Sequence, residues 1–283
     1  MPTFTHRSRL PASPLHAYAW HARDAALLRL QPGWAPARLV ARSGPLADGM
    51  RVTLDVPTPL GRRRWVAEHR ECRPGAGFTD VQVEGPFRHW RHAHRFHADG
   101  DGCLLEDHID WELPWLLAPG AVLVPRQLRR LFAWRHRVTA ADLAAHAAAG
   151  LAPQRIAVSG ASGFVGAPLA AFLGAGGHEV LALRRSGGDG IRWDPASGTV
   201  DATRADGLDA VVHLAGENIH ARRWSAEFRA RIRASRIDAT AALCRSLAAL
   251  PRPPRTFISA SAIGIYGDRG DTELDEDSAP GDG

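Results

Sequence analysis

Apolar and polar positions alternate over six stretches in the first part of the chain, which is the pattern of half-buried β-strands. The stretches are residues 37–44, 50–59, 62–72, 78–85, 88–98 and 102–114. Clusters of Gly, Pro and Asp separate them, and "PLADGM" and "HADGDGC" carry the Asp-Gly signal of hairpin turns. The pattern therefore predicts a series of antiparallel strands.

Two helical patterns flank this series. Residues 14–30 predict a helix with Ser13 as its N-cap and Pro14 at the first helical position. Residues 124–148 predict a long helix with one mostly apolar face, outlined by Val124, Leu128, Leu131, Phe132, Arg135 and Val138. The first 148 residues therefore predict an α+β domain in which an antiparallel sheet grips a long closing helix around an apolar cavity.

The pattern changes after residue 150. Gly150 and Pro153 end the long helix, so residues 149–154 are a predicted linker. Beyond it, strand patterns alternate with helix patterns, which is typical of a parallel, doubly wound sheet. The predicted strands are 155–160, 178–185, 208–216 and 255–261, and the predicted helices are 165–175 and 225–249. The second predicted domain is an α/β Rossmann domain over residues 155–283.

Composition narrows the function classes. Hydrophobic residues make up 45% of the 283 residues, enough for two cores. Three widely spaced cysteines fit no metal site and favour reduced thiols in a cytoplasmic protein. The first residues lack the apolar region of a signal peptide, and we expect no membrane span. Arginine supplies all 35 basic residues of a chain with net charge +5, but they are scattered, so we expect no nucleic-acid partner.

Three glycines follow the first strand of the predicted Rossmann domain and open its first helix. Gly160 permits a tight turn, Gly163 lets the backbone approach a pyrophosphate, and Gly166 lets the helix pack closely. The helix N-terminus then offers free N–H groups to the phosphates. The predicted cofactor-binding residues of this loop are Gly160, Ser162, Gly163, Phe164, Val165 and Gly166.

The next strand ends at Arg184 and Arg185. In NAD-binding domains an acidic residue near this position accepts a hydrogen bond from the ribose 2′-OH. Arginine pairs instead with a 2′-phosphate. The two arginines therefore predict a preference for NADP(H) over NAD(H).

Histidines and acids in the predicted sheet form a second candidate site, for a metal or for acid/base chemistry. His89, His92, His94 and His97 cluster in "HWRHAHRFH", and His92 and His94 share one strand face. Because Trp90 and Phe96 lie among them, and neither cysteine nor HExxH is present, the sequence favours packing over a metal site.

Three acids, Glu106, Asp107 and Asp110, could act as acid/base groups at a cavity mouth. Alternation favours a solvent face for Glu106, His108 and Asp110.

The motifs "SGASGFVG", "HLAGENI" and "FISASAIGIYGDRGD" together resemble the extended short-chain dehydrogenase/reductases. The resemblance covers residues 155–283 and is to the atypical subgroup of epimerase-family, sugar-nucleotide-epimerase-like oxidoreductases. Some members carry a START-like (SRPBCC) domain in front. The element order of residues 1–148 resembles that domain, which is typical of polyketide cyclases, dehydrases and lipid-transfer proteins.

The resemblance implies further site residues. Leu214, Ala215 and Gly216 match the turn along the adenosine side of the cofactor. Arg236 falls where the family presents a polar side chain to the cofactor, although a surface arginine is an equal interpretation. Ser261 matches the serine that hydrogen-bonds the substrate oxygen beside a Tyr-xxx-Lys pair, and is the catalytic candidate.

The chain departs from the family at that pair. It contains no lysine, and Tyr266, the nearby tyrosine, lies in a "YG" turn. We therefore expect an N-terminal fragment of a longer protein, with a Rossmann domain that is incomplete. The function predicted is an NADP(H)-binding oxidoreductase or epimerase-like protein that takes a small-molecule substrate or an apolar ligand in its first domain. The alternative is a non-catalytic protein that binds or senses ligand and cofactor.

Overall fold

The chain forms two compact units in the computed structural model, which describes residues 1–58 and 61–281. The first unit contains Met1–Gln154 and Pro168–Glu179, and the second contains Arg155–Ala167 and Val180–Gly283. The ends of the predicted strand 50–59 and of the predicted domain 155–283 lie outside the described residues.

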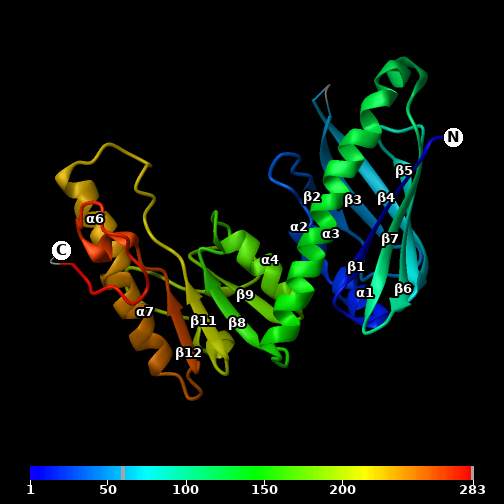
Figure 1. Ribbon diagram of the computed structural model, residues 1–283. Coiled ribbons are helices and arrows are strands. Elements are labelled where there is room, and N and C mark those ends of the chain that lie inside the picture. The colour runs from blue at the N-terminus through cyan, green and yellow to red at the C-terminus, as the bar shows by residue number, and fades with distance from the viewer. Residues whose placement is uncertain (59–60, 282–283) are drawn as a thin grey trace. The chain divides into compact units, whose positions relative to one another are not determined.

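A seven-stranded antiparallel sheet forms most of the first unit (Figure 1). Its strand order is β1-β7-β6-β5-β4-β3-β2. The first strand in the chain, β1, therefore pairs with the seventh, β7, along its whole length, from Thr3↔Asp110 to Leu10↔Cys103. The strands are β1 (Thr3–Leu10), β2 (Arg38–Arg42), β3 (Arg51–Thr58), β4 (Gly61–Arg73), β5 (Gly77–Glu84), β6 (His89–Asp99) and β7 (Gly102–Glu112).

Helices cover one part of this unit. They are α1 (Pro14–Ala22), α2 (Asp24–Arg29), the 3-10 helix η1 (Trp115–Leu123) and α3 (Val124–Ala149). The single helix predicted over 14–30 is two helices, because Arg23 has extended backbone angles (φ −74°, ψ 142°). Its guanidinium donates to the carbonyl of Ala175 at 2.5 Å, a contact that local propensity does not encode.

The 26-residue helix α3 lies across the sheet, which confirms the predicted helix-grip architecture (Figure 1). Leu128 and Phe132 pack with Trp90, Ile109 and Trp111 in one core cluster. The buried face then continues into polar residues, namely His136, Thr139 and Asp142. The buried face of the helix therefore becomes largely polar in its second half, where Leu143 is also buried, whereas the sequence predicted a mostly apolar face.

Asp142 shows how the polar half is satisfied. Its carboxylate, 2% exposed, accepts two hydrogen bonds from Arg29 at 2.8 and 2.9 Å. A buried carboxylate requires such pairing, because leaving it unpaired costs several kcal/mol. The bidentate pair fixes α2 against α3.

The second unit has a five-stranded sheet of order β10-β9-β8-β11-β12. Its strands are β8 (Arg155–Ser159), β9 (Glu179–Arg184), β10 (Ile191–Arg192), β11 (Ala210–His213) and β12 (Thr256–Ser259). β11 pairs in parallel with both β8 and β12, and β10 pairs in parallel with β9. This parallel sheet confirms the predicted Rossmann class.

The helices that connect these strands are α4 (Gly166–Gly176), α5 (Ala202–Ala205), α6 (Ala226–Arg236) and α7 (Asp238–Ala248), and the 3-10 helix η2 (Ile263–Tyr266) follows β12. The long helix predicted over 225–249 divides at Ile237, whose N–H bonds back to Arg233 and Ala234. The core of this unit packs Leu183, Ile191, Val211 and Leu243, among others.

The three cysteines are free thiols. Within residues 1–58 and 61–281, every helix is too short or too polar to cross a membrane.

We expect Phe132→Ala to lower the free energy of unfolding of the first unit by about 3–5 kcal/mol, because it empties the centre of the gripped face. Urea unfolding followed by tryptophan fluorescence measures this, since seven of the nine tryptophans lie in residues 1–134. The exposed Arg129→Ala on the same helix is the control. An equal midpoint shift in both variants would contradict the assigned role of Phe132.

Candidate functional site

The glycine loop joins β8 to α4, as predicted. Gly160 has a φ of +68°, and a Cβ there would lie 3.1 Å from the backbone of Leu214 and Ala215. A Cβ on Gly166 would overlap the carbonyl of Gly160. These two glycines are therefore required by the fold itself.

Gly163 differs from its two neighbours in this respect. Its N–H donates to the Gly160 carbonyl at 2.8 Å, and a Cβ would meet only that oxygen, at 3.1 Å. Ser162, Phe164 and Val165 are exposed, Phe164 by 98%. The chain itself thus leaves the surface over Gly163 open, which is the room that a pyrophosphate needs.

Ser159, the last residue of β8, ties two strand ends together. Its side chain is fully buried, and its Oγ accepts hydrogen bonds from the N–H groups of Leu214 and Ala215, each at 3.0 Å. His213 Nδ1 lies 2.8 Å from the same Oγ. Because both lone pairs of Oγ are used, the hydroxyl proton goes to His213 Nδ1. Burial, and then Arg236, lower the pKa of His213, which keeps the ring neutral.

The predicted turn 214–216 thus lies directly beside the glycine loop. A Cβ on Gly216 would lie 2.9 Å from the guanidinium of Arg236, the last residue of α6. The structure therefore brings Arg236 to this turn rather than to an unrelated surface. The role of Ser159 could not be predicted from the sequence, because its partners Leu214 and Ala215 lie on a distant part of the chain.

Arg184 and Arg185 line a second feature, a hollow of about 330 Å³ beyond the end of β9. Arg192 and Arg204 also line it, with Asp201 as its one carboxylate. Asp201 serves as the N-cap of α5, accepting from the Arg204 N–H at 3.2 Å. Four arginines therefore surround the hollow, and sequence reasoning missed two of them because they lie on later elements.

Ser261 follows β12 by two residues and is exposed. β12 is in register with β11, which is in register with β8, through Ser259↔His213↔Ser159. The carboxyl ends of all three strands therefore lie at one edge of the sheet, and Ser261 lies just beyond that edge. Tyr266 closes η2, five residues further on.

The first unit contains a cavity of about 130 Å³ between sheet and helices. Its apolar lining residues include Leu30, Leu46, Met50, Val52 and Phe78. Polar residues also line it, and we call this set the polar wall: His21, His69, Asp80, His92, His94 and Arg135.

The charges of the polar wall depend strongly on those of the neighbouring residues Asp107 and His136. Burial opposes ionisation of Asp107, but His94, His136 and His92 outweigh it and hold the pKa of Asp107 well below its usual range. Burial likewise opposes the charged form of His94, but Asp107 and Asp80 raise its pKa to about 9. For His21 burial, together with the charge of His94, outweighs the opposing effects of the Ala17 carbonyl and Asp107 and lowers its pKa to about 4.

The candidate acids Glu106 and Asp107 lie on opposite faces of β7. Glu106 pairs with Arg7 at 2.6 Å and with Arg95 at 2.8 Å. Asp107 faces the opposite way, toward the histidines, and is 3% exposed.

Comparison with known proteins finds a similar family for each part of the chain. Residues 156–282 match the family model "NAD dependent epimerase/dehydratase family", and residues 10–137 match "Polyketide cyclase / dehydrase and lipid transport". The epimerase family protein SDR39U1 of Bos taurus is 40% identical over 131 residues, which are 45% of this chain and 43% of the relative. An epimerase family protein of Mycobacterium leprae is also 40% identical, over 45% of this chain and 42% of the relative.

Two solved structures are also similar to this chain. The nucleoside-diphosphate sugar epimerase from Corynebacterium glutamicum is 32% identical, covers 100% of this chain and 59% of its own, and has a TM-score of 0.78. Human SDR39U1 (isoform 2) with NADPH is 37% identical over 45% of this chain and 43% of its own, with a TM-score of 0.40. The chain spans less than half the length of the curated relatives named above.

We expect Ser159→Ala to lower the free energy of unfolding of the second unit by about 1–3 kcal/mol, since the N–H group of Ala215 loses its acceptor and that of Leu214 keeps only the Ser159 carbonyl, at 3.3 Å. Amide hydrogen exchange at Leu214 and Ala215 should accelerate more than elsewhere in the unit. Ser162→Ala, in the exposed loop, is the control. Unchanged exchange at these two amides in Ser159→Ala would contradict the tie between β8 and β11.

Proposed function

We propose that this chain, which joins a polyketide cyclase-type helix-grip domain to an NAD dependent epimerase/dehydratase-type Rossmann domain, is an NADP(H)-binding oxidoreductase or epimerase-like protein with an apolar-ligand domain in front. The support for this proposal is that each part of the chain matches a family model, each over less than half of the 283 residues. The NADP(H) preference, the residue roles and the domain boundaries near 148 and 155 are our proposals.

The glycine loop is proposed to hold the cofactor pyrophosphate. Gly163 has space above it that no side chain of the described loop fills, and the loop leads into the N-terminus of α4. Free N–H groups at a helix start bind phosphate oxygens without further positive charge. The turn at Leu214–Gly216 lies against Gly160, and the guanidinium of Arg236 lies against Gly216, where we propose that they contact the adenosine and ribose parts.

The hollow at the end of β9 is the observation that carries the NADP(H) preference. A 2′-phosphate carries between one and two negative charges near neutral pH. Arg184 and Arg185 line the hollow together with Arg192 and Arg204, and Asp201 is already engaged as a helix cap. The ribose of NAD(H), by contrast, is recognised by a carboxylate that accepts a hydrogen bond from its 2′-OH, whereas the arginines of this hollow can only donate.

The nicotinamide, when bound, supplies hydride transfer. Ser261 stands at the carboxyl edge of the sheet where a substrate oxygen would lie, and its hydroxyl would orient that oxygen by a hydrogen bond. Ser261 is therefore the residue of this chain that we propose to contact the substrate.

The first domain is proposed to bind an apolar small molecule. Its cavity is lined in part by aliphatic and aromatic side chains, as small-molecule sites commonly are. A cavity of about 130 Å³ suits a small group or one part of a larger ligand.

We expect the wild-type chain to bind NADP(H) roughly 10- to 100-fold more tightly than NAD(H), since a hydrogen bond to a charged group contributes about 1.5–3 kcal/mol. Arg185→Ala should lose most of this preference by weakening NADP(H) alone. Calorimetric titration of both cofactors measures it, and added salt should reduce the preference.

Two further variants make this test specific. Arg245→Ala, an exposed arginine on α7, should leave both affinities unchanged. Gly163→Val should weaken both cofactors alike, because its side chain occupies the space of the pyrophosphate. Equal affinities for the two cofactors in the wild type would sink the assignment of Arg184 and Arg185.

A second candidate function is cofactor and ligand binding without turnover. It is favoured by the absence of lysine from the sequence, which leaves Tyr266 without the partner that lowers a catalytic tyrosine's pKa in the related enzymes. We expect this chain to show little or no NADPH oxidation with a panel of carbonyl compounds. Robust oxidation that Ser261→Ala abolishes would instead favour the enzyme.

A further inference from the structure

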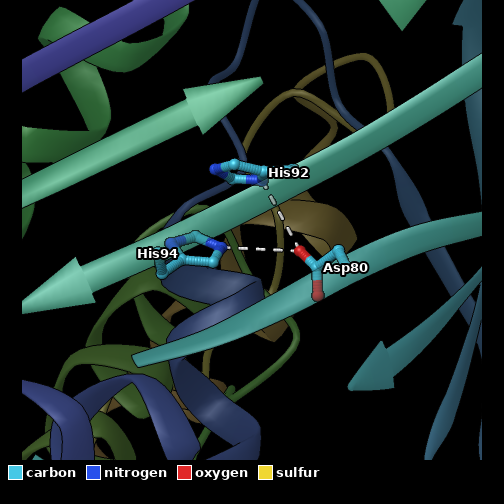
Figure 2. Close-up of side chains that lie close together, drawn as sticks. All are labelled: Asp80, His92 and His94. Atoms are coloured by element: carbon cyan, nitrogen blue, oxygen red, sulfur yellow. Dashed lines mark ion pairs between the residues drawn. The ribbon is translucent and has the colours of Figure 1, made fainter. Parts of the chain in front are cut away.

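Asp80, His92 and His94 face one another on the inner side of the first sheet. Asp80 lies on β5 directly opposite His92 on β6, and His94 lies two residues further along the same face. Figure 2 shows both imidazole rings turned toward one oxygen of the Asp80 carboxylate. This group forms part of the polar wall of the cavity.

The separations between these groups are unusual for hydrogen bonds. Asp80 Oδ2 lies 3.6 Å from His92 Nδ1 and 3.5 Å from His94 Nε2. Ordinary N–H···O hydrogen bonds span about 2.7–3.2 Å. The ligand atoms of all three residues nevertheless lie within 4.8 Å of one another.

Those separations fit atoms that share an ion. Bonds of about 2.0–2.2 Å in a tetrahedral zinc site place neighbouring ligand atoms ~3.3–3.6 Å apart. An octahedral ion such as Mg²⁺, with bonds of about 2.0–2.1 Å, would draw them to ~2.8–3.0 Å. The distances and the two imidazoles both favour a tetrahedral, nitrogen-preferring ion.

Asp107 supplies the outer carboxylate that such sites use. Its Oδ1 lies 3.0 Å from His92 Nε2 and 2.6 Å from His94 Nδ1. Each histidine thus turns one nitrogen to Asp107 and the other to Asp80. A carboxylate behind a histidine fixes the tautomer so that the forward nitrogen keeps its lone pair for a metal.

Two further histidines, His69 and His136, contact the outer oxygens of the two carboxylates. His69 Nε2 lies 2.8 Å from Asp80 Oδ1, which leaves Oδ2 as the oxygen that faces His92 and His94. His136 Nε2 lies 2.5 Å from Asp107 Oδ2. A dication balances the two carboxylates when the imidazoles are neutral, and the nearby charge of Arg135 is then left for an anionic ligand oxygen.

We propose that Asp80, His92 and His94 bind one Zn²⁺-class divalent ion, with Asp107 as the orienting carboxylate and the fourth position open to the cavity. Three protein ligands and an open position are typical of zinc sites that bind water or a substrate oxygen. Arg135 lines the same cavity, so an anionic or carbonyl oxygen of a ligand is the group that suits this position. The sequence disfavoured a metal because Asp80, in a stretch far from the histidine cluster, gave no sign of joining it.

The test is calorimetric titration of the full chain with ZnCl₂ after treatment with EDTA. We expect one ion per chain, a higher melting temperature with zinc, and with Co²⁺ a visible absorption band typical of tetrahedral coordination. His92→Ala and His94→Gln should each weaken zinc binding by at least about 100-fold, and Asp107→Asn by about 10- to 100-fold.

His97→Ala is the matched control, because His97 is an exposed histidine on the same strand. It should leave zinc binding unchanged. Should His92→Ala fail to fold, Asp80→Asn keeps the shape of the side chain and must weaken zinc binding in a chain whose circular dichroism is unaltered. Absence of binding in the wild type, or binding that all of these variants retain, would overturn the proposal and leave a proton-linked network of ion pairs.

Discussion

A carboxylate stays ionised inside an apolar domain only when partners surround it, and Asp107 imposes that requirement on the first unit. It lies on β7 and contacts His92 and His94 of β6 and His136 of α3. Removing any one of these partners leaves a buried charge less compensated. The position of α3 against the sheet is therefore set by charge as well as by the apolar packing around Phe132, and the polar wall of the cavity follows from it.

The second unit rests on a different kind of constraint, the meeting of parallel strand ends. Ser159 satisfies the N–H groups of Leu214 and Ala215, and Gly160 allows the backbones to approach to the distance this needs. The carboxyl edge of the sheet is therefore built mostly from main-chain groups, which the Ser159 side chain holds together. Side chains enter the proposed cofactor site mainly as arginines, which suits a ligand that is itself rich in phosphate.

Much of the architecture could be predicted from the sequence, because alternation and helical period report local burial. The sheet, the long helix α3 and the strand–loop–helix at Gly160 follow from such patterns. The breaks at Arg23 and Ile237 could not be predicted, since the backbone turns there to meet distant groups. Asp80 was missed for a related reason: its partners are on another strand, and an inward-facing acid contradicts the rule that inner positions are apolar. Arg192 and Arg204 join the hollow only through the fold of later elements.

The pairing of β1 with β7 has a consequence for how the first unit is made. Thr3 pairs with Asp110, so the sheet is complete only after roughly a hundred further residues have been synthesised. Closing so long a loop is entropically unfavourable, and domains rich in such distant pairings fold in milliseconds to seconds. During translation β1 therefore has no partner strand until β7 has emerged. Arg7 and Arg9, which lie on the same face of β1, keep the unpaired strand charged and hinder its pairing with other chains.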